Sequence, residues 1–161
     1  MRTWLLVAIS VVFAALLGQA PEFTQQYAQR LGGAIDELDR IVRHFDEDSR
    51  RSGYDRSGAL ALMRRNQEQL IRDQAARISE TIDRLAKLRA QQFAMNQPGS
   101  FNRVTAFASG YDQDIGSRTW RDFQFALPIS VDAILWMGTG FVASLVLLWF
   151  AAVGLGRLTR A

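Results

Sequence analysis

The sequence predicts an all-α membrane protein, with a transmembrane helix near each end and a charged helical domain between them. Three observations carry this prediction. Residues 4–20 and 133–156 contain no charged side chain. Residues 21–126 hold 16 of the 19 basic residues and 15 of the 16 acidic residues. Within that charged stretch the apolar residues recur every three or four positions, which is typical of an amphipathic helix, and no stretch alternates as a strand would.

The N-terminal apolar segment, residues 1–20, allows two interpretations. Arg2, the apolar run and Gly18-Gln19-Ala20 resemble a secretory signal peptide with a small-x-small cleavage site. Cleavage would leave Pro21 as the first residue, and we expect an imino acid there to hinder cleavage. The favoured interpretation is a retained anchor, which is just long enough to span a bilayer.

The middle domain, residues 21–126, is predicted to contain helices over about 21–52 and 56–96 and an interrupted helix over 100–126. Gly53 is expected to end the first of these helices. The short connection after it predicts that the first two helices fold back as an antiparallel hairpin.

Ile78 and Leu85 belong to a coiled-coil-like seam in the second predicted helix, because Ile71, Ile78 and Leu85 are spaced by seven. We therefore expect Ile78 and Leu85 to be packing residues of the hairpin. Further along, Trp120 begins an aromatic stretch that is typical of the membrane–water interface.

The C-terminal apolar segment, residues 127–156, is predicted to be the second transmembrane helix, followed by a basic tail over 157–161. Roughly 20 apolar residues in a helix cross a hydrocarbon core about 30 Å thick. Asp132 lies in its first turn, where an acid either pairs with Arg118, Arg121 or a serine or is exposed among the headgroups. Gly140 and Ser144 form a small-xxx-small pair that allows close helix contact, as do Ala14 and Gly18 in the first segment.

Orientation follows from the flanking charges. Basic residues before the first span and after the second favour the cytoplasm. The sequence therefore predicts a bacterial inner-membrane protein with both termini cytoplasmic and the middle domain periplasmic.

No catalytic, cofactor-binding or metal site is predicted. The chain has no cysteine and one histidine, His44, whose neighbouring carboxylates fan around a helix, so at most two could face one ion. Asp112 and Asp114 lack the spacing of a calcium loop. Acidic and basic residues alternate finely, so the sequence pI of 9.9 indicates no nucleic-acid surface, and no small-molecule substrate is evident.

Two segments resemble a known family. The stretches Pro21 to Asp46 and Thr119 to Ile134 are similar to two blocks of a bacterial family catalogued as domain of unknown function 2937. The resemblance extends over nearly the whole chain and implies a membrane-associated helical protein. It implies no catalytic residue and no activity.

These features favour a non-enzymatic scaffold, adaptor or accessory subunit that uses its helical hairpin. Its expected partners are membrane lipids and either another envelope protein or a second copy of the chain. The alternative is a small oligomeric pore or transport component, which would need polar side chains in the spans. Ser10, Thr139 and Ser144 are the candidates for such a lining.

Overall fold

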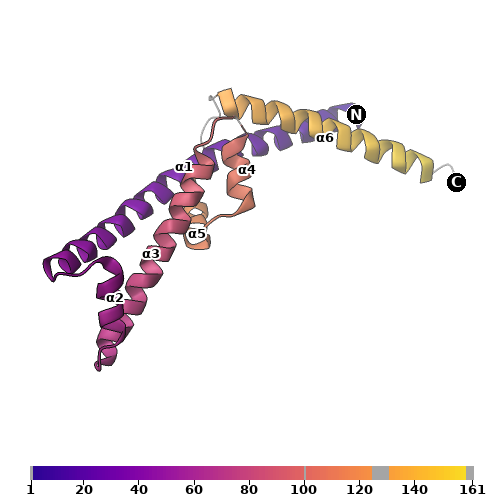
Figure 1. The fold of residues 1–161 in the computed structure, drawn as a ribbon. Helices are drawn as coiled ribbons and strands as arrows, with labels where there is room; N and C mark the ends of the chain where they lie inside the picture. The colour runs from indigo at the N-terminus through magenta and orange to yellow at the C-terminus, as the bar shows by residue number, and fades with distance from the viewer. Residues whose placement is uncertain (1, 100, 125–130, 159–161) are drawn as a thin grey trace. The chain divides into compact units, whose positions relative to one another are not determined.

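The protein is all-helical over the residues that its computed structural model describes, 2–99, 101–124 and 131–158, and no strand occurs among them. Figure 1 shows the helices in chain order: α1 (Arg2–Arg51), α2 (Arg56–Arg64), α3 (Gln69–Met95), α4 (Asn102–Ser109), α5 (Gln113–Arg121) and α6 (Val131–Leu158). The predicted fold class is confirmed at this level. Two of these helices, α1 and α6, are long and apolar enough to cross a membrane.

The chain forms two compact units. The first unit comprises residues 1–27 and 95–161, and the second comprises residues 28–94. The first unit thus contains both apolar segments. It also contains α4 and α5, which the sequence analysis groups with the middle domain.

Helix α1 continues through Pro21, where the sequence predicts that one helix ends and another begins. A proline inside a helix removes one backbone hydrogen bond and is tolerated where packing holds the helix on both sides. Here Gly18 contacts α6, and Phe23 and Tyr27 pack against aromatic rings of α4. Tertiary contacts therefore hold the helix together across this residue.

The second unit has a core of apolar side chains from α1, α2 and α3. Leu60, Ala75 and Ile78 are buried together, and Phe45 and Ile82 pack against them. Further along α3, Leu85 is also buried, with 4% of its surface exposed. The predicted packing residues Ile78 and Leu85 are therefore both core residues.

Helices α2 and α3 are separate, whereas the sequence predicts one helix over 56–96. The Asn66 side chain accepts a hydrogen bond from the Glu68 N–H at 2.9 Å, and Arg72 donates to the carbonyl oxygens of Asn66 and Gln67. Asparagine competes in this way with helical hydrogen bonds and favours a turn. The chain therefore leaves the helix at Arg65 and resumes at Gln69.

The end of α1 agrees with the sequence. Gly53 follows the helix with a φ of 80°, a conformation that glycine adopts without steric cost. Asp55 then caps α2 by accepting a hydrogen bond from the Gly58 N–H at 2.8 Å. A hydrogen bond from the Ser57 hydroxyl, together with the one from the Gly58 N–H, lowers the pKa of Asp55, because both stabilise the carboxylate.

Candidate functional site

An aromatic pocket lies in the first unit. Phe23 of α1 lies at its centre. Its ring centroid is 5.4 Å from those of Phe107 and Phe123 and 6.0 Å from that of Trp120. All three contacts are edge-to-face, the arrangement that aromatic quadrupoles favour.

Helix α5 is positioned by hydrogen bonds to α1. The Asp112 N–H donates to the Tyr27 hydroxyl at 2.9 Å, and the Tyr27 side chain is fully buried. The Asp112 carboxylate in turn caps α5 by accepting from the Ile115 N–H at 3.0 Å. After α5, the Gln26 amide donates to the carbonyl oxygen of Gln124 at 3.1 Å. One turn of α1 therefore holds both ends of α5.

The pocket has a volume of about 370 Å³. Its lining is apolar apart from Gln19 and Thr24, and the Thr24 hydroxyl already donates to the carbonyl oxygen of Pro21 at 3.0 Å. The remaining lining residues are Leu16, Ala20, Phe23, Val104, Phe107, Ala108, Trp120 and Phe123. This lining offers no general acid, base or nucleophile and suits an apolar ligand.

A second hollow adjoins the pocket and shares Phe23, Phe107 and Trp120 with it. Its other walls come from the Tyr111 ring, which stacks on Phe107 at 4.8 Å, and from α5. Trp120 is 75% exposed at this place. Trp120, which the sequence assigns to an interfacial aromatic stretch, therefore lines both hollows. Its place at the membrane–water interface stays a prediction.

Small residues bring α1 and α6 into close contact within the same unit. A Cβ atom on Gly140 would lie 2.7 Å from Leu17 Cδ1, and one on Gly18 would collide with Met137. Ser10 and Ser144, on the same faces of their helices, are 0% and 5% exposed. Gly140 therefore lies against α1, and Ser144, one turn further along α6, is buried; their predicted role in contact between membrane helices stays a prediction. α6 lies alongside the first part of α1 (Figure 1).

Asp132 lies in the first turn of α6 and is exposed. Its predicted pairing with an arginine stays a prediction.

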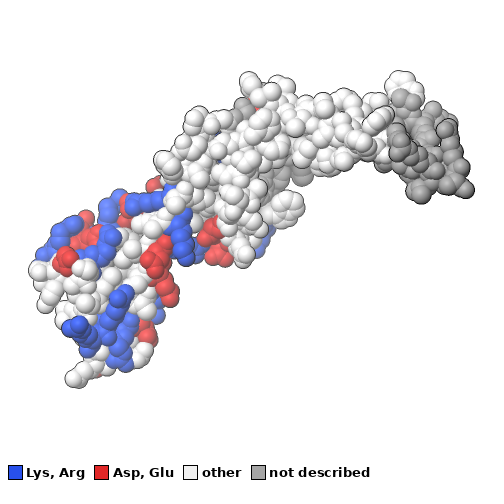
Figure 2. Space-filling view, turned by 45° about the vertical axis from the view of Figure 1, so that its right-hand side comes forward, with Lys and Arg blue, Asp and Glu red and all other residues white. Residues whose placement is uncertain are grey.

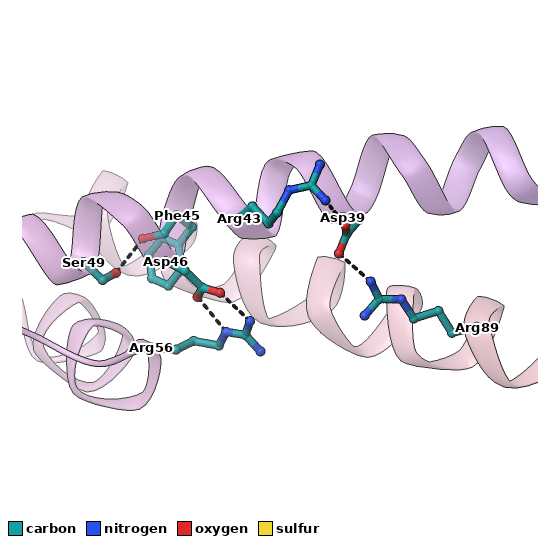
Figure 3. A network of polar contacts seen from close by, with 7 residues as sticks. All are labelled: Asp39, Arg43, Phe45, Asp46, Ser49, Arg56 and Arg89. Atoms are coloured by element: carbon teal, nitrogen blue, oxygen red, sulfur yellow. Dashed lines mark hydrogen bonds and ion pairs between the residues drawn. The ribbon is translucent and has the colours of Figure 1, made fainter.

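Ion pairs connect the helices of the second unit (Figure 3). Asp39 of α1 binds Arg89 of α3 at 2.5 Å and also pairs with Arg43. Asp46 receives two hydrogen bonds from Arg56 of α2, at 2.8 and 2.6 Å. The hydrogen bonds from Arg56 lower the pKa of Asp46, because they stabilise its charged form.

Metal-ligating side chains do not gather among the residues that the structure describes: no group of three or more His, Cys, Asp or Glu comes together there. His44 is exposed on α1. Asp112 serves as a helix cap.

The pocket is what the sequence analysis missed. Phe23, Val104, Phe107, Trp120 and Phe123 are visible as apolar positions of three separate helical stretches. Periodicity indicates which face of a helix is apolar but not which other helix covers that face, so convergence on Phe23 is not predictable from spacing alone.

The chain was compared with protein families, curated proteins and solved structures. No curated protein and no solved structure matches the chain. The model of a protein family described as "Protein of unknown function (DUF2937)" matches residues 3–161. The match covers nearly the whole sequence, including both apolar helices and the pocket. The chain therefore belongs to the DUF2937 family.

Proposed function

We propose that this protein is an inner-membrane protein held by two spans, the apolar first part of α1 and α6, and that residues 28–94 form a non-enzymatic scaffold or adaptor. The observation that carries the proposal is the α1–α6 pair. Small residues lie where the two helices meet, and large apolar side chains cover the faces that point away from this contact. Val12 and Leu16 of α1 are 61% and 60% exposed, and Val142 and Leu147 of α6 are 60% and 63% exposed.

Lipid accounts for this exposure better than water does. Each large apolar side chain left in water forgoes about 1.5–3 kcal/mol of burial free energy. Apolar residues cover the outward faces of both helices, a larger patch than soluble monomers usually expose. A hydrocarbon environment removes this cost, and small residues then supply the helix contact, as they do in membrane interfaces.

The scaffold role is supported by the second unit. The Asp39–Arg89 ion pair and the packing of Phe45 on the Ile78 cluster join α1 to α3 in the order expected of an antiparallel hairpin. In Figure 2 the blue and red side chains of Lys, Arg, Asp and Glu gather over α2 and α3. Over the described part of α6 the surface shown is almost entirely white, which marks uncharged residues.

Two apolar side chains near the α2–α3 turn are suited to anchor a partner. Leu62 and Leu70 are 53% and 70% exposed, and the residues between them include the exposed polar side chains of 64–69. Apolar anchors surrounded by polar residues are typical of protein interfaces. The partner that this surface fits is another envelope protein or a second copy of the chain.

The burial of the candidate lining residues argues against the pore alternative. Ser10 and Ser144 are buried on the faces through which α1 and α6 meet. Thr139 is exposed, but its hydroxyl donates to the carbonyl oxygen of Leu135 at 2.9 Å. A pore would therefore need polar groups that the described part of the spans does not provide.

Carbonate extraction and protease shaving test the membrane proposal. We expect the full-length chain to stay in the pellet after alkaline carbonate, and protease added to spheroplasts to cut residues 28–94. A chain that dissolves in carbonate without detergent would refute the anchoring. A middle region protected from outside protease would reverse the orientation.

Site-specific photocrosslinking tests the scaffold. A photoreactive amino acid at position 70, in native membranes, should give a discrete crosslinked product that Leu62→Ser weakens. The control is Gln67→Ser, an exposed polar change in the same turn. Crosslinking that is unaffected by Leu62→Ser would count against this surface as the partner site.

A further inference from the structure

We propose that the aromatic pocket binds an acyl chain of a membrane phospholipid, with the lipid phosphate held by arginines of α4 and α5. This inference rests on the proposed membrane location. It assigns a ligand to a pocket whose lining has no charged group.

The pocket is continuous with the apolar surface of α1. A shallow groove of about 280 Å³ on α1 is lined by Ala8, Ile9, Val12, Phe13 and Leu16. Leu16 also lines the pocket, so the groove and the pocket share a wall. An apolar track therefore runs along one helix from Ile9 to Phe23.

The track is long enough to hold a lipid tail. Fourteen residues of helix rise roughly 21 Å, at 1.5 Å per residue. One leaflet contributes about 15 Å, half of the hydrocarbon core. An acyl chain lying along the exposed face of α1 can thus reach the pocket without leaving apolar surface.

The lining of the pocket suits an acyl chain. The pocket holds about 370 Å³ and is lined by the aromatic rings of Phe23, Phe107 and Trp120. A flexible, unbranched hydrocarbon chain adapts to such an apolar space and needs no polar partner there.

Arginines on two of the helices that line the pocket, α4 and α5, favour a phosphate headgroup. Arg103 precedes the lining residue Val104 on α4, and its Nε is buried without a hydrogen bond to any described residue. A buried guanidinium nitrogen left unpaired is costly, and phosphate is an acceptor that guanidinium groups bind well. Arg118 and Arg121 are exposed on α5 on either side of Trp120.

Photolabelling from a lipid tail tests the proposal. The full-length protein is placed in bilayers of phosphatidylethanolamine and phosphatidylglycerol that contain a phosphatidylglycerol with a diazirine in its acyl chain. After irradiation, mass spectrometry of peptides should find label in residues 104–123. Label on α6 reports general contact with lipid and serves as the internal reference.

Two pocket-filling variants and one matched control sharpen the test. Ala108→Phe fills the pocket from α4, and Ala20→Phe fills it from α1. Ser109→Phe adds the same ring to an exposed neighbour that does not line the pocket. We expect both filling variants to lower label in 104–123 about tenfold, equivalent to 1.4 kcal/mol. Ser109→Phe should leave it unchanged, and all three should keep the α6 label.

A headgroup arm tests the phosphate contact. Arg103→Gln should reduce labelling by the diazirine phosphatidylglycerol but not by a diazirine diacylglycerol with the same tails. Equal labelling of 104–123 in Ala108→Phe and Ser109→Phe would overturn the acyl-chain site. Label that appears on α6 but not in residues 104–123 would overturn it as well. That is the result expected if a protein segment fills the pocket. Failure of the membrane proposal is distinguishable, because such a chain would already dissolve in carbonate.

Discussion

Replacing Gly140 tests the close packing of α1 and α6. A Cβ at this position would lie 2.7, 3.1 and 3.3 Å from Cδ1, Cβ and Cγ of Leu17. The Leu17 Cβ is fixed to the backbone and cannot rotate away, so the helices themselves must move apart. Gly138, two residues earlier in α6, has no atom within 4 Å of the corresponding Cβ. Gly140→Leu and Gly138→Leu are therefore matched variants of one helix.

The expected difference between these variants follows from overpacking. Both changes raise helix propensity by the same amount, up to about 1 kcal/mol. That gain cancels in the comparison. Forcing a larger side chain into a filled contact costs about 1–3 kcal/mol. We therefore expect Gly140→Leu to be less stable than Gly138→Leu by about 1–3 kcal/mol.

Denaturation in micelles measures this difference. The chain has no cysteine, so donor and acceptor dyes can be attached to cysteines added beyond the two termini. Titration with sodium dodecyl sulfate then reports separation of α1 and α6 as a loss of energy transfer. Gly140→Leu should lose transfer at a lower detergent fraction than Gly138→Leu. Coincident curves would show that Leu17 and Gly140 do not pack closely.

Three further predictions concern the remaining contacts. Asp46→Asn should lower the free energy of unfolding at pH 7 by at most about 1 kcal/mol, because Arg56 is partly exposed, and thermal melts should detect the loss as a lower melting temperature. Hydrogen bonding lowers the folded pKa of Asp46, so this difference should persist above pH ~4 and disappear as pH falls through the folded pKa. Ile78→Asp should cost about 3 kcal/mol or more in thermal melts followed by circular dichroism. The exposed control Ala76→Asp should cost less than about 1 kcal/mol, mainly through lower helix propensity, and equal effects would contradict the burial of Ile78. Tyr27→Phe should lower the free energy of unfolding by about 1–2 kcal/mol, because the Asp112 N–H loses its hydrogen bond to the Tyr27 hydroxyl. Hydrogen exchange of the Asp112 amide should become faster, and an unchanged rate would show that this hydrogen bond does not protect the amide.

Much of the fold was predictable because its signals are local. Two uncharged apolar runs indicate α1 and α6, and Gly53 indicates the end of α1. The spacing of Ile78 and Leu85 indicates a buried face of α3, and both side chains are buried. These features depend on residues within a few turns of one another.

The misses depend on contacts between distant residues. Pro21 signals a helix start locally, but packing by Gly18 and Phe23 carries the helix through it. Asn66 interrupts the predicted second helix through one side-chain hydrogen bond, which a count of apolar positions does not detect. The pocket needs α1, α4 and α5 together.

The contact of Leu17 with Gly140 has a consequence for biosynthesis. The two residues are about 120 positions apart, and a ribosome adding ~5–20 residues per second needs on the order of ten seconds between them. During that interval the small-residue side of α1 has no α6 to receive it. Nascent chains therefore pass through a stage at which this groove is open to chaperones or to a mispaired neighbour, and stalling translation before residue 131 would prolong that stage.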